Sequence, residues 1–266
     1  MRRCLAFKVQ LVTVGVAQIK KYKKAKRNVL GLPQFPNRHR LTIYGERDIV
    51  DLTKIRALGV PFWLAGGYGS PEKLAEALAS GATGVQVGTA FAFCEESGLE
   101  NKHKRALLEK VLSGTARVFT DPVASPTSFP FKVAKLDGSA SDDEVYSVRP
   151  RICDLGYLRE AYRTPSGTID YRCSAEPVTT YMAKGGQLED TVGKKCLCNG
   201  LMANIGHPQS RNGKYVEQAL VTSGNDLTEI GRFMSPGAST YAAADVIAKL
   251  MSGVESPAKD QTVVVV

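Results

Sequence analysis

Two glycine-containing loops are the parts of this sequence best suited to chemistry. Gly66-Gly67-Tyr68-Gly69 follows the apolar run Val60–Ala65, and Gly88-Thr89 follows a shorter run that starts at Gly84. Glycines let backbone N–H groups approach an anion closely, and a helix that begins just after such a loop adds the positive end of its dipole. Ser70-Pro71 is a typical helix start. The two loops together predict a phosphate-binding site.

The spacing of these glycines excludes two common nucleotide-binding motifs. Glu72 occupies the position where the dinucleotide-binding fingerprint needs its third glycine, and the chain has no Gly-Lys-Ser/Thr sequence. A Gly-Gly pair alone is a weak signal, because a tight strand-to-helix turn needs glycine for steric reasons. Two such loops one strand–helix unit apart match instead the phosphate grip of (β/α)₈ barrels, which the loops after strands seven and eight form.

Strands and helices alternate around these loops. The continuous apolar run Val60–Ala65 predicts a buried parallel strand, and Gly84–Gly88 is expected to form a second short strand. The two would be joined by a right-handed crossover. A short amphipathic segment, Ile49–Leu58, precedes them and is expected to end at Gly59. Three helices are predicted from apolar stripes: Leu74, Ala75, Leu78 and Ala79; Leu107, Leu108, Val111 and Leu112; and Ala242, Val246, Ile247 and Leu250.

The formal net charge of +9 belongs to one end of the chain. Residues 1–45 hold eleven Lys and Arg and no Asp or Glu, so 46–266 keep 24 basic against 26 acidic residues, a net of −2. We therefore expect no nucleic-acid partner for the body of the protein. No run of eighteen apolar residues exists, so no membrane span is expected either.

The chain resembles the nitronate monooxygenase family, formerly called 2-nitropropane dioxygenases, over FWLAGGYGSPEKLAEALASGATGVQVGTAFAFCEESG, residues 62–98. The likeness continues through YGERDIVDL (44–52), RVFTDPVASPTSFPFKV (117–133), RPRICDLGYLREAYR (149–163) and KKCLCNGLMANIG (194–206). The likeness covers roughly residues 44–250. The cysteine-bearing part of the chain resembles a branch of the family that has a long C-terminal extension. The resemblance implies a (β/α)₈ barrel that binds FMN, in which the flavin is reduced by a nitronate and reoxidised by oxygen. By the same likeness, the residues that hold the FMN phosphate are Gly66, Gly67, Gln86, Gly88 and Thr89.

The chain departs from the family pattern before Tyr44. The family's catalytic histidine lies in a Gly-His-Asn-Ala-Pro-like segment there, and this chain has LPQFPNRHRLTIYG, residues 32–45. His39 lacks the flanking pattern, so no catalytic residue is assigned. His103 is expected on a solvated helix face. About three strand–helix units fit between Arg47 and Gly114, whereas a complete barrel takes about 250 residues. The chain is therefore expected to correspond to the C-terminal part of such an enzyme, with open sheet edges that favour self-association.

Four cysteines lie beyond the barrel-like segment: Cys153, Cys173, Cys196 and Cys198. Zinc takes four thiolates, but the spacing lacks paired C-x2-C knuckles, and buried free cysteine is common. Both interpretations stay open, and no metal is assigned. Six cysteines in 266 residues do not indicate a disulfide scaffold, so reduced thiols in the cytoplasm are expected.

The sequence thus predicts an α/β protein with four parts: a basic arm (1–43), the C-terminal part of a flavin-binding barrel (44–116), an irregular α+β extension (117–251) and a tail (252–266). The function that the resemblance implies is FMN-dependent oxidation of alkyl nitronates with O₂. The alternatives are another FMN- or phosphate-binding barrel oxidoreductase, such as an enoyl reductase, and a non-catalytic fragment.

Overall fold

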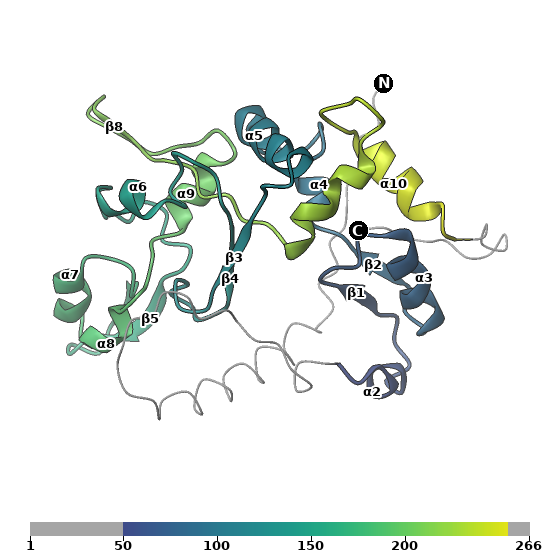
Figure 1. Cartoon of the computed structure of the whole chain (residues 1–266). Helices are drawn as coiled ribbons and strands as arrows, with labels where there is room; N and C mark the ends of the chain where they lie inside the picture. Colours follow the sequence, from purple (N-terminus) through teal and green to yellow (C-terminus); the bar gives the residue numbers. More distant parts are fainter. Residues whose placement is uncertain (1–49, 255–266) are drawn as a thin grey trace, which may run out of the picture. The chain divides into compact units, whose positions relative to one another are not determined.

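A computed structural model describes residues 50–254 of the chain (Figure 1). The predicted basic arm, His39 and the tail from residue 255 lie outside the described residues. The described part divides into two units, one made of residues 50–87 with 253–254 and the other of residues 88–252. The four-part division expected from the sequence, with its boundary at residue 116, stays a prediction. None of the helices in this part of the chain is long and apolar enough to cross a membrane.

The first unit contains the predicted pair of parallel strands (Figure 1). Trp63 lies opposite Gly84, and Ala65 lies opposite Gln86. Because the strands are parallel and in register, the segments that follow Ala65 and Gln86 leave this sheet at the same end. The strands are shorter than expected, and each is flanked by a helix. The elements are α2 (Leu52–Arg56), β1 (Trp63–Ala65), α3 (Pro71–Ala79) and β2 (Gly84–Gln86).

Helix α3 begins and ends where the sequence predicts. Ser70 caps its first turn by accepting a hydrogen bond from the backbone N–H of Lys73 at 3.3 Å. Gly81, at φ +86°, follows its last turn. The predicted apolar stripe is partly wrong, because Leu74 and Ala77 are buried whereas Ala75 and Ala79 are exposed. Leucines and alanines cover more than half of the circumference of this helix, so packing decides which of them are buried.

The second unit is built from short helices and two-stranded antiparallel sheets. Its helical elements are α4 (Thr89–Ala92), α5 (Asn101–Leu112), α6 (Asp143–Ser147), α7 (Val178–Ala183), α8 (Leu188–Thr191), α9 (Cys198–Ala203), the 3₁₀ helix η2 (Asn225–Phe233) and α10 (Ala243–Met251). Its strands are β3 (Val118–Asp121), β4 (Phe131–Ala134), β5 (Glu160–Arg163), β6 (Ile169–Arg172), β7 (Ser210–Arg211) and β8 (Tyr215–Val216).

Two apolar regions hold the second unit together. In one, η2 packs against α4, α5 and α10, and it buries Leu227, Ile230 and Phe233. Two positions of the predicted helical stripes are wrong here, since Leu112 is 56% exposed and Ile247 is 46% exposed. The other region is a cluster around the β3–β4 hairpin. Its buried members are Phe131, Val133, Ala140, Tyr146, Leu197 and Leu220.

The hairpins β3–β4 and β5–β6 were not predicted as strands. Prolines surround the first hairpin, and Arg-, Tyr- and Gly-rich sequence surrounds the second, so neither shows a clear two-residue period. Backbone pairing along four residues in each strand defines them instead. The fold is therefore mixed α/β with short strands. Within residues 50–254 every sheet has two strands and no closed barrel is present.

Candidate phosphate-binding loop

Gly66 and Gly67 form the turn that connects β1 to the start of α3. Their φ angles are +88° and +91°, a left-handed region that side chains other than glycine rarely adopt. Both glycines are exposed, and a Cβ atom placed on either would meet no atom within 4 Å. Backbone conformation therefore requires these glycines, and open space lies over them.

The loop contains backbone N–H groups that can donate hydrogen bonds to a ligand. No described residue accepts a hydrogen bond from the N–H of Gly67 or Tyr68. Lys73 lies nearby, with its Nζ 5.9 Å from the centre of the Tyr68 ring. Its hydrogen bond to Glu76, at 2.6 Å, raises the pKa of Lys73, so this side chain is cationic at neutral pH. Free backbone N–H groups in such a turn suit an anion.

Gln86, the next residue assigned to the phosphate, ends β2. It is exposed, whereas its neighbours Val85 and Val87 are buried, as the alternation of a strand requires. Since Gln86 pairs with Ala65, its side chain belongs to the last residue pair of the β1–β2 sheet, directly before the glycine turn. The structure thus brings Gly66, Gly67 and Gln86 to one end of this sheet.

The Thr89 hydroxyl forms hydrogen bonds within the second unit. It donates a hydrogen bond to Asp226 Oδ1 at 2.6 Å and accepts one from the Gly224 N–H at 3.1 Å. The residue is 7% exposed, and its neighbour Gly88 is exposed. The hydroxyl that the sequence assigned to a phosphate therefore already has two protein partners, one of them a carboxylate. The phosphate role of Gly88 and Thr89 stays a prediction.

The comparison with protein families matches residues 42–125 to the nitronate monooxygenase model. This segment is similar to the nitronate monooxygenase family. The match includes the whole glycine loop and the pair β1–β2, and it confirms the resemblance seen in the sequence over residues 42–125. The resemblance expected beyond residue 125 stays a prediction. The family consists of FMN-dependent enzymes. No curated protein and no solved structure matches the chain.

The glycine loop fits the phosphate end of FMN. Its N–H groups are free among the described residues, and the space above them is open. Thr89 does not add a free hydroxyl in this arrangement, so the fit rests on backbone donors. For the isoalloxazine ring, the described residues of the nitronate monooxygenase segment identify no binding group.

Two of the three histidines, His103 and His207, lie in the described part of the chain. His103 was expected on a solvated helix face, and this is wrong, because its side chain is only 13% exposed on α5. Burial lowers the pKa of His103, a positive charge on Lys102 lowers it further, and Glu100, 3.7 Å away, opposes both. His207 lies in an exposed loop after α9. His39 lies outside the described residues.

Sequence reasoning missed Asp226 and Gly224 as partners of Thr89. They lie more than 130 positions further along the chain, and no motif connects them to the GVQVGTAF segment. Only the packing of η2 against α4 brings them to Thr89. No feature of the sequence by itself indicated this contact.

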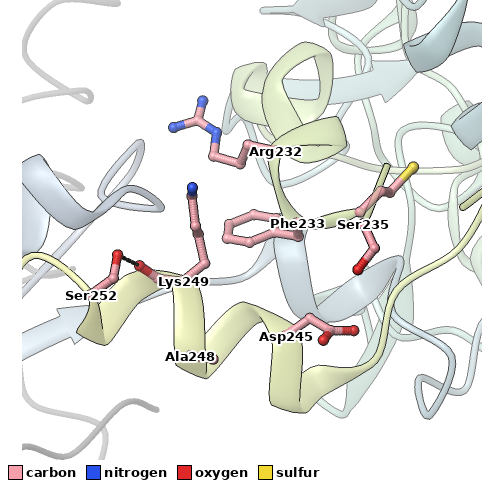
Figure 2. A pocket seen from close by; sticks show the side chains of 8 residues that line it. Arg232, Phe233, Ser235, Asp245, Ala248, Lys249 and Ser252 are labelled. Atoms are coloured by element: carbon pink, nitrogen blue, oxygen red, sulfur yellow. Dashed lines mark hydrogen bonds between the residues drawn. The ribbon is translucent and has the colours of Figure 1, made fainter. Parts of the chain in front are cut away.

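A shallow groove elsewhere in the second unit does not involve the predicted phosphate residues. It has a volume of about 390 Å³ and lies between η2 and α10 (Figure 2). Arg232 and Lys249 extend from these two elements with their charged ends toward the same side (Figure 2). Arg232 forms an ion pair with Glu229 at 3.1 Å. The groove is therefore separate from the candidate phosphate loop in its lining residues.

Proposed function

We propose that this protein is an FMN-dependent oxidoreductase that acts on nitronates or similar carbanions with O₂ as the electron acceptor. The observation that carries the proposal is the Gly66-Gly67 turn, which combines positive φ angles, open space and free N–H groups within the nitronate monooxygenase segment. The backbone N–H groups of this turn would bind the FMN phosphate, and Gln86 would contact it from the end of β2. Gly88 and Thr89, which belong to the second unit, are part of the phosphate-binding set that the resemblance implies.

Bound FMN would supply the redox chemistry, taking electrons from the substrate and passing them to oxygen. The chain's own contribution at this loop is to hold the phosphate and so to fix one end of the cofactor. Nitronates are already deprotonated, so their oxidation needs no catalytic base to remove a proton. The (β/α)₈ architecture is part of the same proposal, because it is the fold of the family. So is a cytoplasmic setting, which the free cysteines favour.

The deciding experiment compares FMN with riboflavin, which lacks the phosphate. We expect the purified chain to bind FMN more tightly than riboflavin by about tenfold or more, as measured by flavin fluorescence titration. Gly67→Asp should abolish this difference, because the carboxylate repels the phosphate. Gly88→Asp should act similarly without backbone strain, since Gly88 has φ −96° and open space around it.

The control for these variants is Gly59→Asp. Gly59 also has a positive φ, +66°, and open space, so the substitution imposes comparable strain at the end of α2. It should leave the preference for FMN unchanged. Equal affinity of the wild-type chain for FMN and riboflavin would contradict the phosphate site. So would an unchanged preference in Gly67→Asp.

A second measurement tests the chemistry. Oxygen consumption with a nitronate and added FMN, above the rate without protein, would support nitronate oxidation. Oxidation of a reduced nicotinamide with an enoyl thioester, and no oxygen uptake with nitronates, would favour an enoyl reductase. A chain that binds neither flavin would be a non-catalytic protein of the same family.

A further inference from the structure

A buried lysine of the second unit holds the turn that follows α4. Lys104, on α5, is 4% exposed. Its Nζ donates hydrogen bonds to three backbone carbonyls, those of Cys94 at 3.0 Å, Glu95 at 2.9 Å and Ser97 at 3.2 Å. Three carbonyl acceptors match the three N–H donors of an ammonium group. Because a buried cation is stable only when its donors are satisfied, residues 94–97 are fixed around the Lys104 side chain.

The helix before this turn, α4, has only four residues, so its carbonyl groups find no partner within the helix. Two of them are satisfied by side chains of the turn. Cys94 Sγ donates to the Phe91 carbonyl at 3.1 Å. Ser97 Oγ donates to the Ala92 carbonyl at 2.6 Å. Lys104 therefore holds the two residues that in turn hold the last carbonyls of α4.

The segment before α10 also holds α4 and this turn. The Glu95 N–H donates to the Tyr241 carbonyl at 3.0 Å, and Thr240 Oγ1 donates to Glu95 Oε1 at 2.6 Å. Tyr241 is 2% exposed, and its hydroxyl donates to the Ala90 carbonyl at 2.7 Å. A helix of four residues is not stable by itself, so these contacts from α5 and from the segment before α10 keep α4 in place.

The beginning of α4 carries the second loop of the proposed phosphate-binding set. Gly88 directly precedes the helix, and Thr89 is its first residue. Asp226 and Gly224 hold the Thr89 hydroxyl at this end, and the turn around Lys104 holds the other end. The backbone of the loop is thus ordered before a ligand binds, and groups that need no ordering bind more tightly.

We infer that Lys104 is a positioning residue for the phosphate group of FMN. The side chain is buried and its donors are used by residues 94–97, so it acts through this turn and α4 on the backbone of Gly88 and Thr89. The inference rests on the proposed function, because it requires that Gly88 and Thr89 contact the phosphate. Loss of Lys104 should therefore weaken the binding of the phosphate more than the binding of the rest of the flavin.

The experiment uses the full chain and the variant Lys104→Ala, which removes the ammonium group and leaves three carbonyls without their donor. The affinity for FMN should fall by about tenfold, whereas the affinity for riboflavin should change by less than about twofold. Hydrogen exchange followed by mass spectrometry should become faster in residues 88–97 and stay unchanged in the β3–β4 hairpin. Lys110→Ala is the matched control, because Lys110 lies on the same helix and pairs with Asp137 at 2.9 Å instead of with the turn.

Chemical rescue separates the cation from the rest of the side chain. Ammonium chloride should partly restore both FMN binding and slow exchange in Lys104→Ala, because an ammonium ion can donate to the three carbonyls. Tetramethylammonium chloride at the same concentration should not, because that ion has no N–H group. If Lys104→Ala does not fold, Tyr241→Phe replaces it, since this variant removes one donor to α4 and keeps the buried ring. It should lower the affinity for FMN more than the affinity for riboflavin.

The outcomes distinguish this inference from the proposed function. A wild-type preference for FMN that stays unchanged in the variant would overturn the inference and leave the proposed function intact. Equal losses of affinity for both flavins would assign Lys104 to folding alone and would overturn it too. So would unchanged hydrogen exchange in residues 88–97, whatever the flavins do. A wild-type chain that does not prefer FMN would contradict the proposed function, and the positioning role with it.

Discussion

At the scale of single residues, Thr89 shows how a side chain suited to a ligand is used by the protein itself. Its hydroxyl lies between the Gly224 N–H and the Asp226 carboxylate and satisfies both. A Cβ atom on Gly224 would come within 2.6 Å of this hydroxyl, so only glycine fits there. The contact joins α4 to η2, and we expect its main role to be the stability of the second unit.

Replacement of Thr89 tests this role. Thr89→Val keeps the shape of the side chain but leaves a buried N–H and a carboxylate without their partner, so the free energy of unfolding should fall by about 1–3 kcal/mol. Thr89→Ser keeps the hydroxyl and should lose less than Thr89→Val. Urea unfolding followed by circular dichroism measures both. A Thr89→Val protein as stable as the wild type would show that the hydroxyl contributes nothing to folding.

At the scale of secondary structure, α3 fixes the far end of the candidate phosphate loop. The helix starts at Pro71, and the Ser70 cap sets the position where the chain turns from loop to helix. Leu74 and Ala77 hold the helix in its unit by burial, and α3 packs on β2. The geometry of Gly66 and Gly67 therefore depends on an anchored strand before them and a capped helix after them.

Loss of the cap should destabilise α3. Ser70→Ala removes the acceptor for the Lys73 N–H and should cost about 1 kcal/mol in the free energy of unfolding. Ser70→Asp restores an acceptor and should recover most of this loss. Because the loop precedes the cap directly, Ser70→Ala should also weaken FMN binding. Ser70→Asp should not restore that binding, because its carboxylate repels the phosphate. Parallel denaturation and FMN titrations measure both effects, and identical values for all three proteins would contradict the assignment.

At the scale of the whole molecule, short sheets leave strand edges without partners among the described residues. The β1–β2 sheet has two strands. Val60, three residues before β1, is 51% exposed. An exposed edge with apolar side chains favours pairing with another chain. We therefore expect concentration-dependent self-association through this region.

A charge placed beside β1 should reduce this association. Lysine near a strand edge is a device that natural sheets use against pairing, so Val60→Lys should shift the protein toward monomer. Val148→Lys is the control, because Val148 is 81% exposed and directly follows α6, in the second unit. Sedimentation velocity at several concentrations separates the cases. A wild-type chain that stays monomeric at every concentration, or equal association of both variants, would contradict the prediction.

The sequence by itself determined the local features around the candidate site. Two consecutive glycines after an apolar run predict a tight turn, because only glycine adopts positive φ without strain, and the structure has this turn at Gly66 and Gly67. Ser70-Pro71 predicts the helix start, because capping depends on residues within one turn. The parallel pairing of β1 with β2 follows from strand–helix–strand order. Each of these features depends on neighbours in sequence.

Only the tertiary structure decided which distant groups meet. It placed Asp226 on Thr89 and Glu217 on Arg149. It also chose Ala77 over Ala75 as the buried side of α3. The contacts join residues up to 137 positions apart in the sequence. The choice between Ala75 and Ala77 distinguishes two residues of equal hydrophobicity. Sequence spacing carries no information about such pairs, because their approach is set by the packing of whole elements against one another.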